Sequence, residues 1–184
     1  MFNESFVFYR PKDIVAGDFY WMESIDGFKF IAVADCTGHG VPGALVSVLC
    51  HNALNRSVKE YGLSDPGMIL DKARSIIIEE LSKNTQEDVK DGMDIALCVI
   101  EGNKLRFSGA NNPLWYVRNE EIHVVKGNKQ PVGKYEVMND FISQEIDIQK
   151  DDVFYLFSDG YVDQFGGEMN KKFKASRLKK LFLS

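Results

Sequence analysis

The sequence predicts an α+β fold, in which antiparallel sheets carry helices on their outer faces. Three observations favour this class. A few strand-like stretches come first, two helical stretches follow, and a longer run of strand-like stretches completes the chain. Short turns rich in Gly, Asn and Asp separate neighbouring strands, as in antiparallel hairpins. The chain also lacks the regular strand–helix alternation of a parallel nucleotide-binding fold.

The N-terminal elements are predicted to form a meander of three strands. Aromatic and aliphatic residues alternate over 6–10, and Pro11 ends that stretch. A second strand covers 18–24, and a turn at Asp26-Gly27 joins it to an apolar strand over 28–34. This arrangement places Asp18 and Asp35 on neighbouring segments.

Two helices are predicted next. Pro42 lies in the first turn of one helix and Gly62 follows its end. Its apolar residues at helical spacing are Val41, Leu45, Val48, Leu49, Leu54 and Val58. The second helix opens at Ser64-Asp65-Pro66, a capping residue followed by proline. Its apolar stripe consists of Ile69, Ala73, Ile76, Ile77 and Leu81, and a polar loop is predicted over 83–90.

The second half of the chain reads as strands followed by one helix. The predicted strands cover 95–101, 104–108, 114–118, 122–126, 141–148 and 153–157. A final helix is predicted from Ala175. With 184 residues, 45% of them hydrophobic, the chain can bury the core of one domain, and we expect a single domain over 1–184.

Composition restricts the partners and the compartment. A net charge of −5 offers no basic stripe for phosphates, so we expect no nucleic-acid partner. Three cysteines without a C-x-x-C pair favour a reduced, cytoplasmic setting. No apolar run approaches the ~20 residues of a membrane-spanning helix.

Three aspartates stand at the edges of predicted strands, each beside glycine or after strand-like sequence. They are Asp18, Asp35 and Asp159. Two carboxylates ~4 Å apart repel by about 1 kcal/mol in water and about 4 kcal/mol at an effective dielectric near 20. A fold that gathers three of them needs a cation, and hard oxygen ligands favour Mg²⁺ or Mn²⁺ over zinc. Alternatively, each aspartate hydrogen-bonds its own backbone in a turn.

The sequence resembles the metal-dependent serine/threonine protein phosphatases of the PPM type, and within them the bacterial branch named after stage II sporulation protein E. The motifs that carry the resemblance are Gly17-Asp18-Phe19-Tyr20-Trp21, Asp35-Cys36-Thr37-Gly38-His39-Gly40, Asp91-Gly92-Met93-Asp94-Ile95-Ala96-Leu97, Gly109-Ala110-Asn111-Asn112-Pro113-Leu114, Gln130-Pro131-Val132-Gly133 and Phe157-Ser158-Asp159-Gly160-Tyr161. They follow the order of the family over nearly the whole chain. The resemblance implies a β-sandwich flanked by helix pairs, a four-layer αββα fold, with two Mn²⁺ or Mg²⁺ ions.

The resemblance also implies a role for individual residues. Asp35 is expected to bridge the two ions, with the backbone carbonyl of Cys36 as a further ligand. Asp18 is expected to act on one ion directly or through water, and Asp159 to bind the other. The implied reaction is hydrolysis of phosphoserine or phosphothreonine by a metal-activated water. The implied substrate is a phosphorylated regulatory protein, for example an anti-sigma-factor antagonist.

Related domains commonly form the output half of a longer sensor. We therefore expect an upstream sensor domain and a cytoplasmic location, including the cytoplasmic part of a membrane-anchored sensor. The sequence also allows a homodimer.

Departures from the family pattern lead to further expectations. The family carries another metal-binding Asp near its C-terminus, on a late strand beyond a helix, whereas no Asp follows Asp163 here. We therefore expect a domain truncated before its final helix and strand, with a weakened ion site at Asp159. Lys12 is the candidate substitute for a phosphate-binding Arg. Asn111-Asn112 stand where the family often has Gly-His.

Several readings remain open for the other polar residues. Two roles are open for His39. It is either the general acid that protonates the leaving oxygen, or a residue that supports the structure or orients the phosphate. Asp94 lies near the ions, or is a strand-end carboxylate. A zinc site built from Cys36, His39, Cys50 and His51 matches no known ligand spacing, and a Cys36–His39 nucleophilic pair is equally disfavoured. The alternative to an enzyme is a phosphatase-fold module that is non-catalytic or inactivated by truncation, acting in protein–protein signalling.

Overall fold

The computed structural model describes residues 4–83 and 90–183 of the chain. The helices are α1 (Gly40–Lys59), α2 (Pro66–Ser82) and α3 (Ala175–Phe182). The strands are β1 (Phe19–Ile25), β2 (Phe28–Cys36), β3 (Gly92–Glu101), β4 (Lys104–Ala110), β5 (Leu114–Arg118), β6 (Glu121–Val125), β7 (Val132–Gly133), β8 (Gln144–Asp147), β9 (Val153–Tyr155), β10 (Phe165–Gly166) and β11 (Lys171–Lys172).

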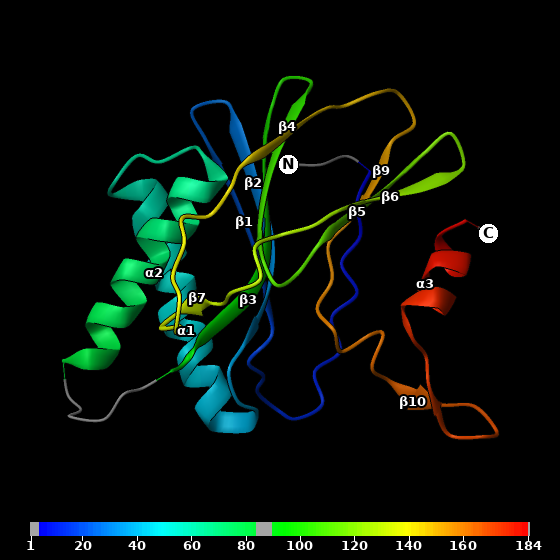
Figure 1. The fold of residues 1–184 in the computed structure, drawn as a ribbon, viewed down its shortest axis with the longest axis horizontal. Coiled ribbons are helices and arrows are strands. Elements are labelled where there is room, and N and C mark those ends of the chain that lie inside the picture. The colour runs from blue at the N-terminus through cyan, green and yellow to red at the C-terminus, as the bar shows by residue number, and fades with distance from the viewer. Residues whose placement is uncertain (1–3, 84–89, 184) are drawn as a thin grey trace.

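Two antiparallel sheets form the centre of the fold (Figure 1). The larger sheet has the order β1-β2-β3-β4-β8, with β7 paired to one end of β3. The smaller sheet has the order β6-β5-β9, and β10 and β11 form a separate hairpin. Every named pair of strands is antiparallel, as the sequence predicts for this fold class.

The central strand β3 is apolar on both faces because it separates two cores. Successive side chains of a strand point to opposite faces. Ile95, Leu97 and Val99 pack into the core beneath α1 and α2. Ala96 and Cys98 pack into the core between the two sheets. The large sheet is therefore an inner layer of the molecule, covered on both sides.

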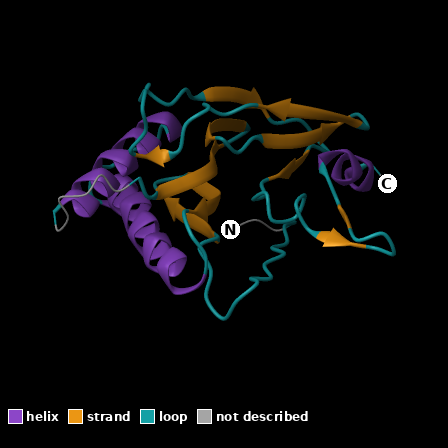
Figure 2. Ribbon diagram, turned by 60° about the horizontal axis from the view of Figure 1, so that its bottom comes forward, coloured by secondary structure: helices purple, strands orange, loops and turns teal. Residues whose placement is uncertain are grey.

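Helices cover the outer faces of the two sheets (Figure 2). α1 and α2 pack on the large sheet, and Asp65 caps α2 by accepting a hydrogen bond from the Met68 backbone N–H at 3.1 Å. On the other side, the Phe182 ring of α3 stacks on Tyr155 of the small sheet at a centroid distance of 3.7 Å. The layers are thus helix pair, large sheet, small sheet and helix. This order confirms the predicted class, with α3 as the helix on the small sheet in the described part of the chain.

The predicted strand over residues 6–10 is wrong. Residues 4–18 are described throughout and contain no strand. The aromatic side chains of this stretch make ring and hydroxyl contacts instead. The Phe8 ring meets Tyr161 edge-on, and the Tyr9 hydroxyl donates to the backbone carbonyl of Asp18 at 2.9 Å. The alternation of aromatic and aliphatic residues predicts an extended segment. A segment joins a sheet only where the edge of a neighbouring strand is available to pair with it.

The expected apolar face of α1 is only half correct. Leu54 and Val58 are buried, whereas Val41, Leu45 and Val48 are 64%, 68% and 67% exposed. The buried positions lie toward the C-terminal half of the helix, and the N-terminal half contributes Gly43 to the protein interior. The first half of α1 therefore presents an apolar stripe to solvent.

Some expected boundaries also shift. The strands predicted over 141–148 and 153–157 shorten to β8 and β9. The predicted loop over 83–90 falls mostly outside the described residues. No helix in the described ranges is long and apolar enough to cross a membrane.

Candidate metal centre

Four aspartates from separate segments of the chain meet at one end of the large sheet. Asp18 precedes β1, Asp35 lies near the end of β2, Asp94 is in β3, and Asp159 follows β9. The β2–β3 register places Asp35 directly opposite Asp94. The Ser158 hydroxyl donates to Asp18 Oδ2 at 2.7 Å, which joins segments 140 residues apart. The fold therefore brings together Asp18, Asp35 and Asp159, as well as Asp94.

Burial, together with the neighbouring carboxylates, raises the pKa of Asp35 from 3.8 to about 8. Burial is the largest cause, and the negative charges of Asp18, Asp159 and Asp94 add to it. The pKa of Asp94 is also raised, first by burial and then by Asp159, while a hydrogen bond from Asn111 acts in the opposite direction. The cluster thus holds more negative charge than its half-buried position tolerates without protons or cations.

A tight turn after β2 fixes the position of Asp35 and Cys36. Gly38 adopts a φ of 90°, a conformation that favours glycine. A Cβ on Gly17 would lie 2.9 Å from the Cys36 carbonyl oxygen, so the segment that carries Asp18 packs directly on this turn. The Thr37 backbone N–H donates to the Gly92 carbonyl at 3.0 Å, which ties the turn to the start of β3.

A cavity of about 150 Å³ opens beside the aspartates. Its walls are formed by Asp35, Cys36, Thr37, Met93, Asp94 and Pro131. A water molecule occupies roughly 30 Å³ in the liquid, so the cavity has room for a cation with part of its hydration shell. Two of the four clustered carboxylates belong to its wall, and it is therefore the space that a ligand of the cluster could enter.

The donor set suits Mg²⁺ or Mn²⁺ better than zinc. The clustered side chains are all carboxylates, and hard oxygen ligands favour these ions. Across residues 4–83 and 90–183, no three acidic, histidine or cysteine side chains already stand in the close arrangement of a finished ion site. The fit therefore rests on ligand chemistry and on the accumulated negative charge.

The buried thiols argue against cysteine chemistry at this site. Cys36 and Cys50 are buried, and a hydrogen bond between them is the largest cause of the raised pKa of Cys36. Burial acts in the same direction and keeps the Cys36 thiol protonated. A protonated buried thiol is a poor nucleophile, so the structure disfavours the Cys36–His39 nucleophilic pair.

His39 and Lys12 lie around the N-terminus of α1, which follows the tight turn. His39 is the N-cap residue of α1, and its exposed side chain makes no capping hydrogen bond. Lys12 is exposed and adjoins Asp13, whose carboxylate oxygen lies 3.9 Å from the position of a Cβ on Gly40. His39 therefore adjoins the turn, the segment that carries Lys12 passes close to it, and neither residue is among the groups that raise the pKa of Asp35.

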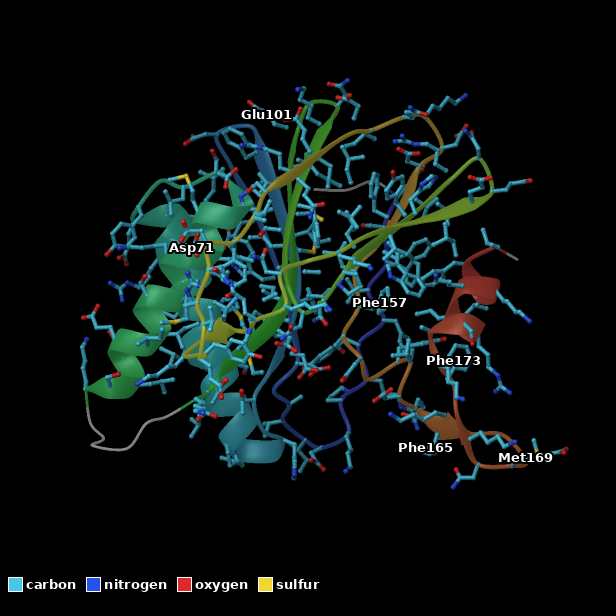
Figure 3. The ribbon with its side chains drawn as sticks, in the orientation of Figure 1. Asp71, Glu101, Phe157, Phe165, Met169 and Phe173 are labelled. Atoms are coloured by element: carbon cyan, nitrogen blue, oxygen red, sulfur yellow. The ribbon has the colours of Figure 1, made fainter. Side chains whose placement is uncertain are left out.

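Three polar residues gain importance from the structure. The sequence alone leaves Asp94 either near the ions or as a strand-end carboxylate, and the strand register places it within the cluster. Ser158 donates a hydrogen bond to Asp18, and Asn111 donates one to Asp94, each at 2.7 Å. Both occur within the recognised motifs, but no spacing in the sequence indicated which aspartate each would contact. Figure 3 labels Phe157, which directly precedes Ser158 and lies on the small-sheet side of the fold.

Comparisons with known proteins show the family to which this chain belongs. The family model described as stage II sporulation protein E (SpoIIE) matches residues 26–183. The phosphoserine phosphatase RsbP of Bacillus subtilis (strain 168) is 25% identical over 160 residues. That match covers 85% of this chain and 39% of RsbP. The chain thus spans well under half the length of this curated relative.

Solved structures show the same fold. The SiaA-PP2C domain of Pseudomonas aeruginosa matches with a TM-score of 0.84 and 30% identity, covering 97% of this chain and 70% of that one. RsbX in complex with magnesium matches with a TM-score of 0.59 and 15% identity, covering 94% of this chain and 80% of that one. At that identity the RsbX likeness supports the fold alone. The chain therefore belongs to the stage II sporulation protein E family and is a PPM-type, PP2C-like phosphatase domain.

Proposed function

We propose that this domain hydrolyses phosphoserine or phosphothreonine on a regulatory protein and that its aspartate cluster holds two Mn²⁺ or Mg²⁺ ions. The convergence of Asp18, Asp35 and Asp159 carries the proposal, because burial and mutual repulsion raise the pKa of Asp35 to about 8. A site that crowds carboxylates in this way is suited to divalent cations. The name of RsbP as a phosphoserine phosphatase supports the reaction class.

The position of each residue suggests its part in ion binding. Asp35 interacts electrostatically with both Asp18 and Asp159, which suits a ligand shared between two ions. The Cys36 carbonyl belongs to the tight turn packed against Gly17, and we assign it as the backbone ligand. Asp18 and Asp159 then serve the two ions separately.

The reaction needs a nucleophile, a stabilised phosphoryl group and a proton for the leaving oxygen. When bound, the two cations supply an activated water and Lewis acidity toward the phosphoryl group. We assign His39 to protonating the leaving serine or threonine oxygen, since it is exposed at the start of α1. Lys12 and the N-terminus of α1 favour an anionic group at the same place. The buried Cys36 thiol takes no part as a nucleophile.

The proposed substrate and cellular context rest on the family resemblance. We propose a phosphorylated protein substrate, of the anti-sigma-factor antagonist type, and a sensor domain upstream in the full protein. We further propose a cytoplasmic location, which includes the cytoplasmic part of a membrane-anchored sensor. The net charge of −5 disfavours nucleic acid as a partner.

A chelation and substitution experiment tests the proposed function. Hydrolysis of p-nitrophenyl phosphate and of a phosphoserine peptide is measured with Mn²⁺, with EDTA, and with Asp35→Asn. We expect EDTA and Asp35→Asn each to abolish turnover. Asp26→Asn is the matched control, because Asp26 lies in the turn at the opposite end of β2 and tolerates asparagine at its φ of 50°. Full activity of Asp35→Asn, or activity that survives EDTA, would contradict the proposal.

A further inference from the structure

Asn111 occupies an unusual backbone position beside the aspartate cluster. It follows β4 and has a φ of 57°, in the left-handed region that few residues other than glycine and asparagine adopt. Its side-chain amide donates to Asp94 Oδ1 at 2.7 Å. Its backbone N–H donates to the Asn128 carbonyl at 2.8 Å, and the Asn128 N–H returns a bond to Gly109 at 2.8 Å. The amide that faces Asp94 is thus held on an anchored loop.

The position of Asp94 calls for such a partner. Asp94 lies directly opposite Asp35 across the β2–β3 pair, and like charges in that position destabilise a sheet. Both carboxylates line the 150 Å³ cavity. A carboxylate has lone pairs on two oxygens, so it can accept the Asn111 bond and still offer an oxygen to a cation. The fixed Asn111 donor therefore leaves the remaining lone pairs of the Asp94 carboxylate available to a cation in the cavity.

We propose that Asn111 is a positioning residue that holds Asp94 beside Asp35, so that Asp94 contributes to cation binding in the cavity. This inference rests on the proposed function and extends it to two residues. Partners that hydrogen-bond a metal ligand orient it, and their removal typically weakens metal binding about 10–100-fold. The competing reading is that the Asn111 bond only fixes the β4–β5 loop.

Calorimetric titration with Mn²⁺ separates these readings. Asn111→Gly removes the amide and accepts the φ of 57° without strain. We expect Mn²⁺ binding to weaken about 10–100-fold. Asn119→Gly is the matched control, because Asn119 also has a left-handed φ, of 51°, but lies in the β5–β6 turn. The control should bind Mn²⁺ like the unaltered protein and retain its activity.

The activity readout distinguishes positioning from catalysis. Asn111 is not assigned a contact with the substrate, so saturating Mn²⁺ should restore turnover of Asn111→Gly while the Mn²⁺ concentration for half-maximal activity stays raised. A loop-fixing role would instead lower the unfolding temperature in EDTA without changing this concentration. Should Asn111→Gly fail to fold, Asp94→Asn tests the same corner of the cavity directly and should show the same loss of Mn²⁺ affinity.

A double-mutant cycle tests whether Asn111 acts through Asp94. Asp94→Asn should weaken Mn²⁺ binding at least as much as Asn111→Gly, and the double variant should bind no more weakly than Asp94→Asn alone. Unchanged affinity in Asn111→Gly, or losses that multiply in the double variant, would overturn the inference. Failure of the unaltered protein to bind Mn²⁺ would instead remove the proposed function itself.

Discussion

Replacing Asp35 by asparagine should stabilise the metal-free protein while it abolishes turnover. The pKa of Asp35 rises from 3.8 to about 8 because of burial and of the neighbouring carboxylates, Asp18 first among them. Between about pH 4 and pH 8 the folded state therefore binds more protons at this position than the unfolded state does. Stability falls as pH rises through this window, and the full cost is present above about pH 8. Asparagine carries no charge and removes that cost.

The size of the effect follows from the same pKa. At 1.36 kcal/mol per pKa unit, a rise from 3.8 to about 8 sets an upper limit near 6 kcal/mol. Asp35 is only half-buried, so solvent screening reduces this value, and we expect a stabilisation of about 1–2 kcal/mol. For a domain of this size, that free energy corresponds to about 2–8 °C in melting temperature.

The assay is thermal unfolding at pH 8 and pH 5, with EDTA or with Mn²⁺. We expect Asp35→Asn to melt at a higher temperature than the unaltered protein in EDTA at pH 8, and the difference to shrink at pH 5. Mn²⁺ should reverse the order by stabilising only the unaltered protein. Asp26→Asn, in the distant turn, should show none of these changes. A lower melting temperature for Asp35→Asn in EDTA at pH 8 would refute the reasoning.

Three further predictions follow. Ser158→Ala removes the hydroxyl that donates to Asp18, so Mn²⁺ should bind at least about tenfold more weakly in calorimetry. Equal Mn²⁺ affinity in the variant and the unaltered protein would show that this hydrogen bond does not orient Asp18. Mn²⁺ binding to the unaltered protein should weaken from pH 8 to pH 6 and release protons, because the cation competes with the proton that the raised pKa of Asp35 retains. Calorimetry in two buffers of different ionisation enthalpy measures the number of protons released. An affinity for Mn²⁺ that does not change with pH would contradict the prediction. Gly43→Ala places a Cβ 2.5 Å from the Gly38 carbonyl oxygen, and it should cost about 1–3 kcal/mol in denaturant unfolding; an unchanged midpoint would mean that the turn can move away from α1.

Local chemistry made much of the fold predictable. The α2 start follows from Asp65 and Pro66, because the carboxylate caps the first turn and proline needs no N–H donor there. The β3–β4 hairpin follows from the two-residue turn between apolar strands, whose glycine Gly102 adopts a φ of 57°. In both cases residues close in sequence contain the information.

Elements that depend on distant partners could not be predicted in this way. The segment around Phe8 has an alternating pattern, yet it contacts Tyr161 rather than a strand edge. The apolar stripe that begins at Val41 has helical spacing, yet the sheet packs beneath only part of α1. Periodicity reports which side chains share a face, and it does not report what covers that face.

The same distinction applies to the aspartate cluster. The ordered motifs indicated Asp18, Asp35 and Asp159, and the structure brings these three together. The participation of Asp94 depends on the register of β2 against β3, since a slip of one residue would move its side chain to the other face. The contact from Asn111 depends in addition on how the β4–β5 loop is anchored to Asn128.

Anomalous diffraction from crystals soaked in Mn²⁺ tests the central claim most directly. The claim predicts manganese peaks at the end of the large sheet, within bonding distance of Asp35 and flanked by Asp18 and Asp159. A map without manganese peaks at these carboxylates, or with peaks only elsewhere on the protein, would contradict it.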